Sequence, residues 1–429
     1  MTENLPQTKL LLAEKIQQHR EKLDEWFGSH ATLAPPPFYC SVDLRDSGHK
    51  IVPVDSNLFP AGFNNLCPED LKNAPPVVRA QIEAFAKRAG ANEIPKRVLI
   101  LPESHTQNLY YIENLYRLHK LLELAGFESA IGWYGALPEG MTFPLELKSA
   151  SGKTLAAFPI EIVEGKMKAG DFTPDLILLN NDFSGGYPEA LDQVTQPIFP
   201  SYVLGWHSRK KSEHFRHYNR LATEFAQIIG ADPWAITIDT ECVEPVNFNE
   251  DIGTDLVAES VNRIMARMAK AHHDRFIDEK PFVFVKNNSG TYGMGVMVVH
   301  SVDEITRMNR RTKNKMSVGK NRSAIESVVI QEGVRTAMRI DEVAAEPVIY
   351  CMGGELIGGF LRANTERGDQ DNLNSQGMVF KKLCMSDLKR PLPALARTQE
   401  VPVLELVYGS VARISALAMG LELAEHLGK

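Results

Sequence analysis

The stretch from Val283 to Val298 constrains the fold more than any other, because two apolar runs flank a loop that carries three glycines. Lys286 ends the first run, and Val296 begins the second run directly after the last glycine. The pattern predicts a strand, a glycine-rich turn and a second strand. It lacks the helix that a Walker-type or dinucleotide-binding loop needs after its glycines. A lysine at a strand end, beside glycines that let backbone N–H groups approach oxygen atoms, suits a flap over phosphate groups. An ordinary hairpin with an exposed lysine has the same pattern.

Composition places the chain among soluble globular proteins with more than one domain. It has 429 residues, of which 44% are hydrophobic and 24% charged, and a formal net charge of −7. The negative charge argues against nucleic acid or an anionic membrane as the main partner. We find no apolar run of membrane-spanning length and no basic start followed by an apolar core, so we expect a cytoplasmic protein.

The cysteines are five in number and scattered along the chain, and none forms a C-x-x-C pair. This pattern predicts free thiols in a reducing compartment, and it does not predict a zinc site. The residues are Cys40, Cys67, Cys242, Cys351 and Cys384.

Three segments of different pattern follow one another along the chain. Residues 1–89 hold an amphipathic helix and two strands joined by a turn, and residues 90–254 alternate strand, helix and strand. Residues 255–429 begin with a long amphipathic helix and continue as strands separated by a basic stretch, before a closing helix. We therefore predict an α/β fold class, with functional loops at the C-terminal ends of strands.

Asp55 and Asn57 lie two residues apart on the second predicted strand of the N-terminal segment. Residues at this spacing face the same side of a strand, so the two side chains can offer oxygen atoms to one hard cation such as Mg²⁺. Asp43 and Asp46, on or near the neighbouring strand, can add charge or a substrate contact. The alternative is that Asp55 and Asn57 only begin a turn, as these residue types often do.

Two later strands also end in polar residues. One turns polar at Gln331 and Glu332, which can offer backbone groups to an adenine edge and a carboxylate to a ribose. Arg362 follows another apolar run, and its forked guanidinium suits a carboxylate or a phosphate. The following loop at residues 372–377, which contains Asn374, can supply amide and hydroxyl donors. Each segment would also suit an exposed strand end or a surface loop.

The order of these elements resembles the ATP-grasp superfamily of carboxylate–amine ligases. Lys286 and the glycine loop resemble the family's phosphate lysine and flap, and residues 331–334 resemble its hinge strand at the adenine. Most members carry the metal ligands after the arginine strand, whereas the matching pair here, Asp55 and Asn57, lies near the N-terminus. Eukaryotic-type glutathione synthetase has that permuted order, and residues 43–46 resemble its strand that bears arginine and aspartate.

Over its full length the chain is similar to the bacterial glutamate–cysteine ligases of the ATP-grasp type. The similarity is carried by residues 55–65, 101–106, 205–212 and 286–295. It implies a reaction in which a glutamate γ-carboxylate takes the γ-phosphate of ATP, with Mg²⁺, and the cysteine amine then displaces phosphate from the acyl phosphate. The fold implied is a Rossmann-like α/β substrate domain at residues 90–254 and two ATP-grasp subdomains at residues 255–429. The metal-binding hairpin within residues 1–89 is then expected to join the ATP-grasp core.

The resemblance also implies roles for individual residues. Lys286 and Arg362 are the expected catalytic residues, and Asp55 and Asn57 are the expected metal ligands. The expected nucleotide-binding residues are Lys286, Gly290, Tyr292, Gly293, Gly295, Gln331, Glu332 and Val334. The expected substrate-binding residues are Arg45, Asn180, Trp206, His207, Arg209, Arg362 and Asn374. For the basic cluster from Trp206 to Lys211, a plain surface turn is the alternative.

The expected partners are the small molecules glutamate, cysteine and ATP, without nucleic acid or membrane, and a homo-oligomer is compatible with the sequence. Another ATP-grasp ligase such as glutathione synthetase is one alternative. An ATP-binding protein without catalysis is a second alternative. The intact set of Asp55, Asn57, Lys286 and Arg362 argues against the second, because a degenerate site would be expected to lose such residues.

Overall fold

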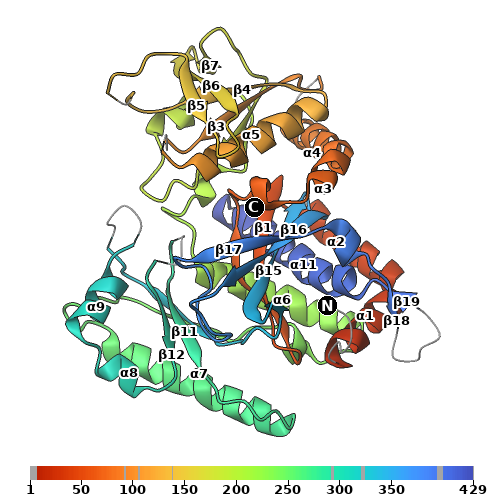
Figure 1. Ribbon diagram of the computed structural model, residues 1–429, viewed down its shortest axis with the longest axis vertical. Helices are drawn as coiled ribbons and strands as arrows, with labels where there is room; N and C mark the ends of the chain where they lie inside the picture. The colour runs from red at the N-terminus through yellow and green to blue at the C-terminus, as the bar shows by residue number, and fades with distance from the viewer. Residues whose placement is uncertain are drawn as a thin grey trace.

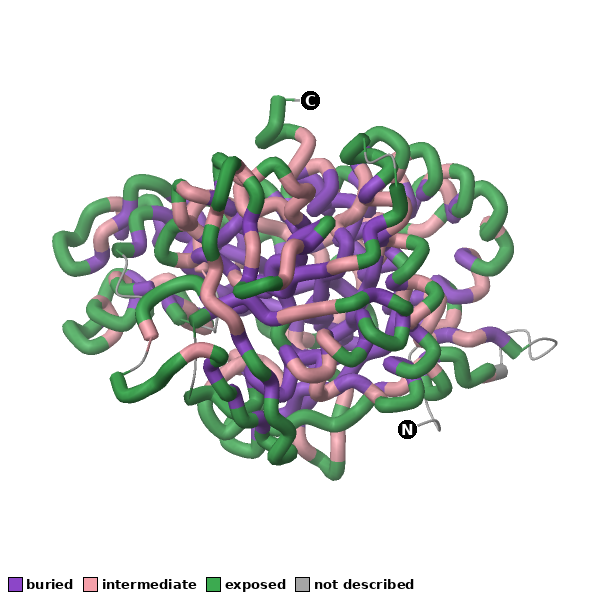
Figure 2. The backbone as a smooth tube through the Cα atoms, turned by 90° about the horizontal axis from the view of Figure 1, so that it is seen from above, coloured by how far each residue is buried: buried purple, intermediate pink, exposed green. Residues whose placement is uncertain are grey.

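The computed structural model describes residues 7–90, 93–104, 107–137, 139–290, 294–319, 324–393 and 400–428. Figure 1 shows three parts: an α/β part at the top, a central sheet with its helices, and a smaller sheet with a long helix at the bottom. Buried residues run through the middle of the molecule, and the peripheral loops are exposed (Figure 2). The buried apolar residues form several clusters, one of which belongs to the smaller sheet and its long helix.

The central sheet combines the N-terminal hairpin with strands from late in the chain. Its strand order is β17-β16-β15-β1-β2, and all neighbouring strands are antiparallel. β1 pairs with β15, with Cys40 opposite Cys351 and Asp43 opposite Val348. This is the pairing that a shared site for the hairpin and the later strands requires. The strands are β1 (Tyr39–Asp46), β2 (Ile51–Asn57), β15 (Val343–Met352), β16 (Glu355–Asn364) and β17 (Met378–Leu383), with the short β14 (Arg339–Ile340) beside β15.

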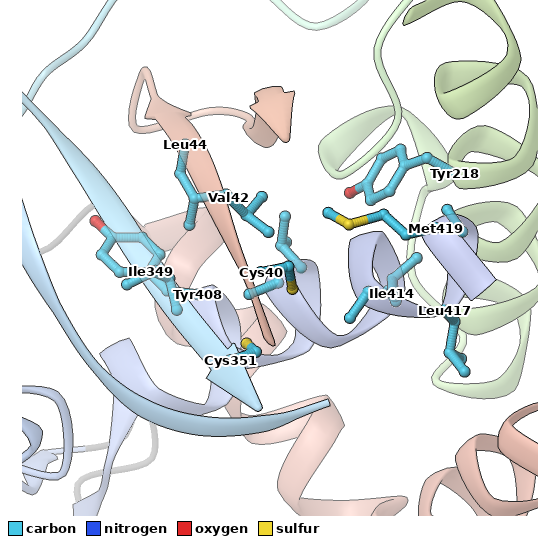
Figure 3. Close-up of a cluster of buried hydrophobic side chains, with 14 of the residues drawn as sticks. Cys40, Val42, Leu44, Tyr218, Ile349, Cys351, Tyr408, Ile414, Leu417 and Met419 are labelled. Atoms are coloured by element: carbon cyan, nitrogen blue, oxygen red, sulfur yellow. The ribbon is translucent and has the colours of Figure 1, made fainter. Parts of the chain in front are cut away.

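One face of the central sheet is apolar, and the other carries charged residues beside apolar ones, because side chains alternate along each strand. We call this second face the charged face. Val42 and Leu44 of β1 and Ile349 of β15 are fully buried and pack towards helix α11 (Val403–His426), as Figure 3 shows. Full burial of such a side chain stabilises the fold by about 1.5–3 kcal/mol. A slip of one residue in register would expose this whole set, so the apolar face fixes the strands that carry the charged face.

Helix α11 is the core helix of the central part. Within the described ranges it alone has the length and apolar composition of a membrane span, but 72% of its most apolar window is buried inside the protein. Helix α6 (Lys211–Ile228) packs beside it. Residues 211–228 therefore pack under the central sheet. From the sequence we expected them in the α/β domain at residues 90–254.

The smaller sheet is antiparallel, in the order β10-β13-β11-β12. Helix α7 (Thr254–Asp274) packs against it through Val257, Val261 and Ile264. β11 and β12 are the two predicted strands and pair antiparallel, with Lys286 opposite Val296. The strands are β10 (Thr240–Val243), β11 (Val283–Asn287), β12 (Val296–Val299) and β13 (Val328–Glu332), and helices α8 (Asp303–Thr306) and α9 (Arg310–Ser317) follow β12.

The third sheet is mostly parallel, in the order β5-β6-β4-β3-β8-β9, with β7 beside β6. Helix α5 (Leu109–Leu124) connects the parallel strands β3 and β4, as in an α/β unit. The predicted α/β fold class is confirmed at this level. The strands are β3 (Arg97–Pro102), β4 (Glu128–Trp133), β5 (Leu145–Lys148), β6 (Thr154–Val163), β7 (Lys166–Ala169), β8 (Leu176–Asn180) and β9 (Ile198–Phe199).

The remaining elements surround these sheets. The helices are α1 (Gln7–Gln18), α2 (Arg20–Leu33), α3 (Pro68–Asn73), α4 (Pro75–Arg88) and α10 (Met385–Leu388). Short 3₁₀ turns are η1 (Phe63–Asn65), η2 (Glu189–Gln193), η3 (Tyr202–Leu204) and η4 (Pro233–Ala235), and β18 (Leu392–Pro393) pairs with β19 (Glu400–Val401).

Candidate functional site

Two adjoining clefts lie along the charged face of the central sheet. The Lys286 cleft lies towards the β11–β12 hairpin and is lined by Asp43, Arg45, Val54, Asp55, Lys211, Phe284, Lys286, Asn287, Gly290, Met294, Val296, Glu346, Arg362, Asn372 and Asn374. The Trp206 cleft lies towards the α/β part and is lined by Ser41, Asp55, Asn57, Phe59, Pro60, Ala61, Gly62, Asn65, Glu103, Asp182, Trp206, Val348, Tyr350, Phe360, Arg362, Asn374, Met378 and Phe380. Asp55, Arg362 and Asn374 line both clefts, so the clefts meet at these residues.

Strand register brings the charged residues of the clefts together. Asp43 lies opposite Asp55, and Glu346 lies opposite Arg362. Directly opposed residues of antiparallel strands share a face, and the pairing of β1 with β15 brings these two pairs together. Arg362 therefore contacts Asp43, although the two residues are 319 positions apart in sequence. Asp43, Glu346 and Arg362 are only 4%, 3% and 8% exposed, which means that their charges interact where water screens little.

Asp55 is held by Lys211, the last residue of the basic cluster that begins at Trp206. Lys211 Nζ donates a hydrogen bond to Asp55 Oδ1 and lies 4.3 Å from the centre of the Trp206 ring. Burial alone raises the pKa of Asp55, but Lys211 and Lys286 lower it more, so the pKa lies below its usual value. Asn57 follows two residues later and lines the Trp206 cleft. Both expected metal ligands therefore reach the clefts, and Asp55 is charged.

A β-bulge positions Lys286. The β1–β2 register shifts between Asp43 and Leu44, which leaves Val54 as the extra residue of β2. Lys286 Nζ donates to the Val54 carbonyl oxygen at 2.9 Å and to Gln331 Oε1 at 2.6 Å. Burial lowers the pKa of Lys286 to about 8, against the opposing effect of a nearby carboxylate. The ammonium joins the central sheet to the smaller sheet at the wall of the Lys286 cleft.

Arg362 joins two carboxylates at the point where the clefts meet. Its Nη1 donates to Asp43 Oδ2 at 2.6 Å and to Glu346 Oε1 at 2.9 Å. Burial raises the pKa of Asp43 more than Arg362 lowers it. At Glu346, Arg45 and Arg362 outweigh burial and lower the pKa. Within the described part of the chain, Arg362 Nε and Asp43 Oδ1 are buried without a hydrogen-bond partner, so both atoms are candidates to contact a ligand.

Arg45 holds the rim of the Lys286 cleft. Its Nε donates to Glu346 Oε2 at 2.6 Å, and its Nη1 and Nη2 donate to the carbonyl oxygens of Asp369 and Asp371 at 2.9 and 2.6 Å. The loop that follows Asp371 contains Asn374, which lines both clefts. Arg45 reaches the cleft as expected, but its donors are bound to the protein, which makes it a support for Glu346 and this loop.

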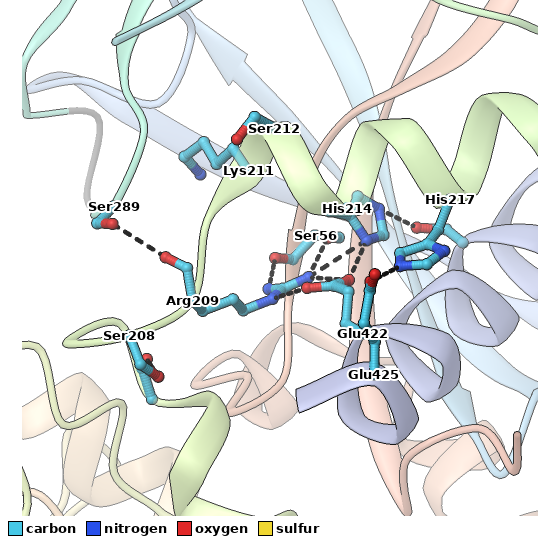
Figure 4. Close-up of polar contacts among 12 residues, drawn as sticks. Ser56, Ser208, Arg209, Lys211, Ser212, His214, His217, Ser289, Glu422 and Glu425 are labelled. Atoms are coloured by element: carbon cyan, nitrogen blue, oxygen red, sulfur yellow. Dashed lines mark hydrogen bonds and ion pairs between the residues drawn. The ribbon is translucent and has the colours of Figure 1, made fainter. Parts of the chain in front are cut away.

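The loop after β11 is attached to the start of α6. The Asn288 carbonyl oxygen accepts a hydrogen bond from the Lys211 backbone N–H at 2.8 Å, and Asn288 Oδ1 accepts one from the Ser212 N–H at 2.9 Å. Ser289 Oγ donates to the Arg209 carbonyl oxygen at 3.0 Å (Figure 4). The glycine loop and Lys211 are thus positioned together.

The structure describes two glycines of this loop, Gly290 and Gly295. Gly290 lines the Lys286 cleft. Gly295 has a φ of +62°, and a Cβ there would lie 2.5 Å from Ile325 Cδ1, so the position requires glycine. Tyr292 and Gly293, which the sequence analysis included among the nucleotide-binding residues, lie outside the described residues.

Glu332 is bound inside the protein, in contrast to the expected ribose contact. Lys50 Nζ lies 2.7 and 2.6 Å from its two carboxylate oxygens, and the Asp239 N–H donates to it at 3.0 Å. Lys50 and Glu332 are each only 3% exposed. Gln331 lies closer to the cleft through its bond to Lys286, and Val334 is buried in a small apolar cluster. Of this segment, the structure therefore brings only Gln331 into contact with the site.

Arg209 does not line either cleft, because its guanidinium is bound below the sheet (Figure 4). Its Nε and Nη2 donate to the Glu422 carboxylate at 2.7 and 3.0 Å, and its Nη1 donates to the Ser56 carbonyl oxygen at 2.6 Å. Burial raises the pKa of Glu422, but Arg209 and His214 lower it to about 2. Instead of the expected substrate contact, Arg209 anchors the start of α6 to α11 and to β2.

Asn180 and His207 also lie outside both clefts, whereas Trp206 lines the cleft named after it. Asn180 Nδ2 donates to the Tyr39 hydroxyl and to the Pro60 carbonyl oxygen, each at 3.0 Å. It therefore supports the wall that Pro60 contributes to the Trp206 cleft. His207 Nδ1 lies 3.3 Å from a backbone carbonyl oxygen, and burial lowers its pKa. Neither residue is in position for the substrate contact that we expected.

The Lys286 cleft combines positive charge with hard oxygen donors. Its lining includes four cations and three carboxylates: Arg45, Lys211, Lys286 and Arg362, and Asp43, Asp55 and Glu346. Cations in a partly desolvated cleft suit a polyanion, and carboxylates beside them suit a hard divalent cation. From the sequence, Lys211 was a candidate only as the last residue of the basic cluster that begins at Trp206, and Glu346 was not expected in the site. The only signal for Glu346 was a carboxylate at the start of an otherwise apolar strand.

We compared the chain with protein families, with solved structures and with curated proteins. A family model described as glutamate–cysteine ligase matches residues 13–423. A crystal structure from Methylobacillus flagellatus KT, provisionally assigned as a gamma-glutamylcysteine synthetase, has 36% sequence identity and a TM-score of 0.87, covering 99% of this chain and 98% of that chain. D-alanyl-alanine synthetase A from Vibrio cholerae has 12% identity and a TM-score of 0.32 over 63% of this chain and 67% of that chain, too little to argue from. Among curated proteins, none matches the chain.

Proposed function

The chain belongs to the glutamate–cysteine ligase family, and we propose that it joins the γ-carboxylate of glutamate to the amine of cysteine at the expense of ATP. The products are γ-glutamylcysteine, ADP and phosphate, which is the first step of glutathione biosynthesis. The observation that carries the site assignment is the meeting of two clefts at Asp55 and Arg362. A phosphate donor in one cleft and an amino-acid acceptor in the other would react at that point.

We place the ATP phosphates in the Lys286 cleft. This cleft is lined by Lys211, Lys286 and Gly290. The two lysine ammonium groups would stabilise the negative charge that builds up on the phosphate oxygens during phosphoryl transfer. The hairpin with its glycine loop supports an ATP-grasp arrangement. The pairing of the early β1–β2 hairpin with the late β15 supports the permuted order of elements. We therefore propose an ATP-grasp arrangement with the permuted order, and a cytoplasmic location.

The residues at the meeting point fit a hard divalent cation such as Mg²⁺. Asp55 and Asn57 supply carboxylate and amide oxygens from one strand face, and the unpartnered Asp43 Oδ1 belongs to the residue directly opposite Asp55. Bound Mg²⁺ would neutralise phosphate charge and align the γ-phosphate. Glu346, held by Arg45 and Arg362, is a further carboxylate for this group.

We place the amino-acid substrates in the Trp206 cleft. Arg362 has an unpartnered Nε there, and a guanidinium can bind a carboxylate and orient it toward the neighbouring phosphate. Glu103 and Asp182 on the opposite wall suit the ammonium group of an amino acid. Aromatic residues of this cleft, Tyr350, Phe360 and Phe380, would help to keep water from the acyl phosphate.

The reaction is tested by mass spectrometry of the product. Incubation with ATP, Mg²⁺, glutamate and cysteine should give γ-glutamylcysteine and ADP in equal amounts. A panel of other acids and amines distinguishes this activity from that of another ATP-grasp ligase, such as a glutathione synthetase. ATP binding without ADP release under any of these conditions would instead support a non-catalytic nucleotide-binding protein.

Arg362→Lys should chiefly impair the use of glutamate. The lysine keeps a positive charge near Asp43 and Glu346 but loses the fork and the Nε donor. We expect kcat/KM for glutamate to fall by about 10- to 150-fold, the equivalent of roughly 1.5–3 kcal/mol for a charge-assisted hydrogen bond. Steady-state kinetics with varied glutamate and calorimetry of nucleotide binding measure the two effects separately. Loss of ATP binding with an unchanged glutamate KM would reverse the assignment.

Nucleotide affinity should decrease as pH rises through about 8. Burial lowers the pKa of Lys286 to about 8, so its ammonium is charged below that pH and increasingly neutral above it. Phosphates favour the charged form, so binding above pH 8 takes up a proton and the affinity falls by up to about tenfold per pH unit. Calorimetry between pH 7 and 9.5, in buffers of different ionisation enthalpy, measures this directly. The same dependence in Lys286→Met would contradict the assignment.

A further inference from the structure

A second cluster of ligand-type side chains lies close in sequence to two segments that line the Trp206 cleft, the one that ends at Asn65 and the one that contains Phe380. Cys67, Asp70 and Cys384 each offer one ligand atom, and these atoms all lie within 4.8 Å of one another. We call these three residues the Cys67 cluster. Cys67 precedes α3, Asp70 lies within α3, and Cys384 precedes α10. Chain segments that are distant in sequence thus bring two thiols and a carboxylate to one point.

Asp70 is the unusual member of the cluster. It is 6% exposed, and its Oδ2 accepts a hydrogen bond from the Met385 N–H at 2.9 Å. Among the described residues no lysine, arginine or histidine forms an ion pair with it, and burial raises its pKa above the usual value. A Cβ on Gly358 would lie 2.9 Å from the same oxygen, so the carboxylate is pressed against the backbone of β16. A buried carboxylate normally has a cation in direct contact. Among the described residues none lies that close to Asp70, and Lys389 lowers its pKa only from a greater distance.

We propose that the Cys67 cluster binds one thiophilic divalent cation of the zinc class through Cys67 Sγ, Cys384 Sγ and an Asp70 carboxylate oxygen. Two sulfurs and one oxygen are a donor set that zinc accepts in tetrahedral geometry, and water would fill the fourth position. Sulfurs bound to one zinc ion lie ~3.8 Å apart, so small side-chain rotations from the present arrangement suffice. Each thiol loses its proton to solvent on binding, and the cation replaces the two protons.

The geometry favours a cation over a reactive thiol pair. A disulfide between Cys67 and Cys384 would leave the carboxylate of Asp70 without a cation, whereas a bound metal ion supplies one. The other thiol pair, Cys40 opposite Cys351, is fully buried in the β1–β15 ladder, and no carboxylate completes a metal-type cluster with it within the described ranges.

The cation would hold one end of the Trp206 cleft together. Pro60, Ala61, Gly62 and Asn65 line that cleft and lie shortly before Cys67 in the chain. Met378 and Phe380 of β17, which precedes Cys384, also line it. A metal bridge between α3 and α10 would fix these two walls relative to each other. The inference does not depend on the proposed ligase reaction, because the cluster contains none of the residues assigned to it.

The experiment is cobalt and zinc binding to the full-length reduced protein in excess Mg²⁺, which keeps the oxygen ligands of the Lys286 cleft occupied. One equivalent of Co²⁺ should give a thiolate-to-cobalt charge-transfer band, and one equivalent of Zn²⁺ should abolish it. Cys67→Ser and Cys384→Ser should each lose the band and bind Zn²⁺ more than about 100-fold more weakly. Cys242→Ser removes an exposed thiol elsewhere and should behave like the parent protein.

Thermal unfolding provides a second measurement, and it shows that each variant is folded. Zn²⁺ should raise the Tm of the parent protein and of Cys242→Ser, and leave the Tm of Asp70→Asn and Cys67→Ser nearly unchanged. Absence of a thiolate band in the reduced parent protein would overturn the proposal. A band that persists in folded Cys67→Ser and Cys384→Ser would also overturn it, since the thiolates would then come from elsewhere.

Discussion

Asp55→Ala should abolish most Mg²⁺-dependent turnover, by about 10³- to 10⁴-fold, because metal-assisted charge stabilisation is worth several kcal/mol. Of the carboxylates that the structure describes, Asp55 alone lines both clefts. Its pKa lies below the usual value, so it offers a charged oxygen where the clefts meet. The loss should show as a large increase in the Mg²⁺ concentration needed for half-maximal activity, together with a fall in kcat. ADP release at varied Mg²⁺ measures both quantities.

The controls separate metal binding from folding. Asp55→Ala also removes the ion pair with Lys211, so its Tm is measured beside that of Asp274→Ala, which loses a carboxylate–lysine pair far from the clefts. Asp274→Ala should keep full activity, and Asn57→Ala should show a smaller defect of the same kind as Asp55→Ala. If Asp55→Ala and Asn57→Ala both keep full Mg²⁺-dependent activity, the metal assignment is wrong.

Two kinds of argument predicted much of this architecture: the hydrophobic periodicity of single segments, and the requirement that the site residues lie close together. The strand, helix and strand expected within residues 90–254 include β3 (Arg97–Pro102), α5 (Leu109–Leu124) and β4 (Glu128–Trp133), and the closing helix expected within residues 255–429 is α11 (Val403–His426). Such segments carry their own periodicity, so they can be located without knowledge of their neighbours. The pairing of β1 with β15 followed from a different argument, because Asp55 had to meet Arg362 for the proposed chemistry.

The partners of buried charges could not be predicted in this way. Lys50 and Glu332 are 282 residues apart and pair through a contact that no local pattern encodes. Arg209 similarly pairs with Glu422, 213 residues away, which removes it from the clefts. A forked arginine in a basic turn looks the same in sequence whether it binds a ligand or supports a helix, because the difference lies in which carboxylate packs against it. The same limit explains why the spacing of Cys67 and Cys384 gave no sign of the Cys67 cluster.

Lys286→Met should impair every reaction that uses ATP by about 10³-fold, the upper range for removal of one preorganised donor to a reacting oxyanion. Lys286 Nζ lies where the two sheets meet, held by the Val54 carbonyl oxygen and Gln331, and is therefore fixed before phosphates arrive. Methionine has a similar length and removes a buried charge, so the fold should keep its stability. Calorimetry should show weaker nucleotide binding, and the defect in ADP release should be equal for all acceptors.

Comparison with Arg362→Lys makes this prediction specific. Lys286 lines only the Lys286 cleft, whereas Arg362 lines both clefts, so the lysine should act on the phosphates and the arginine on the bound carboxylate. Lys286→Met should therefore lower kcat and ATP affinity while leaving the selectivity for glutamate over other acids unchanged. A Lys286→Met enzyme that binds ATP normally and instead loses its preference for glutamate would show that this lysine contacts the acceptor, and the proposed placement of the phosphates would have to be abandoned.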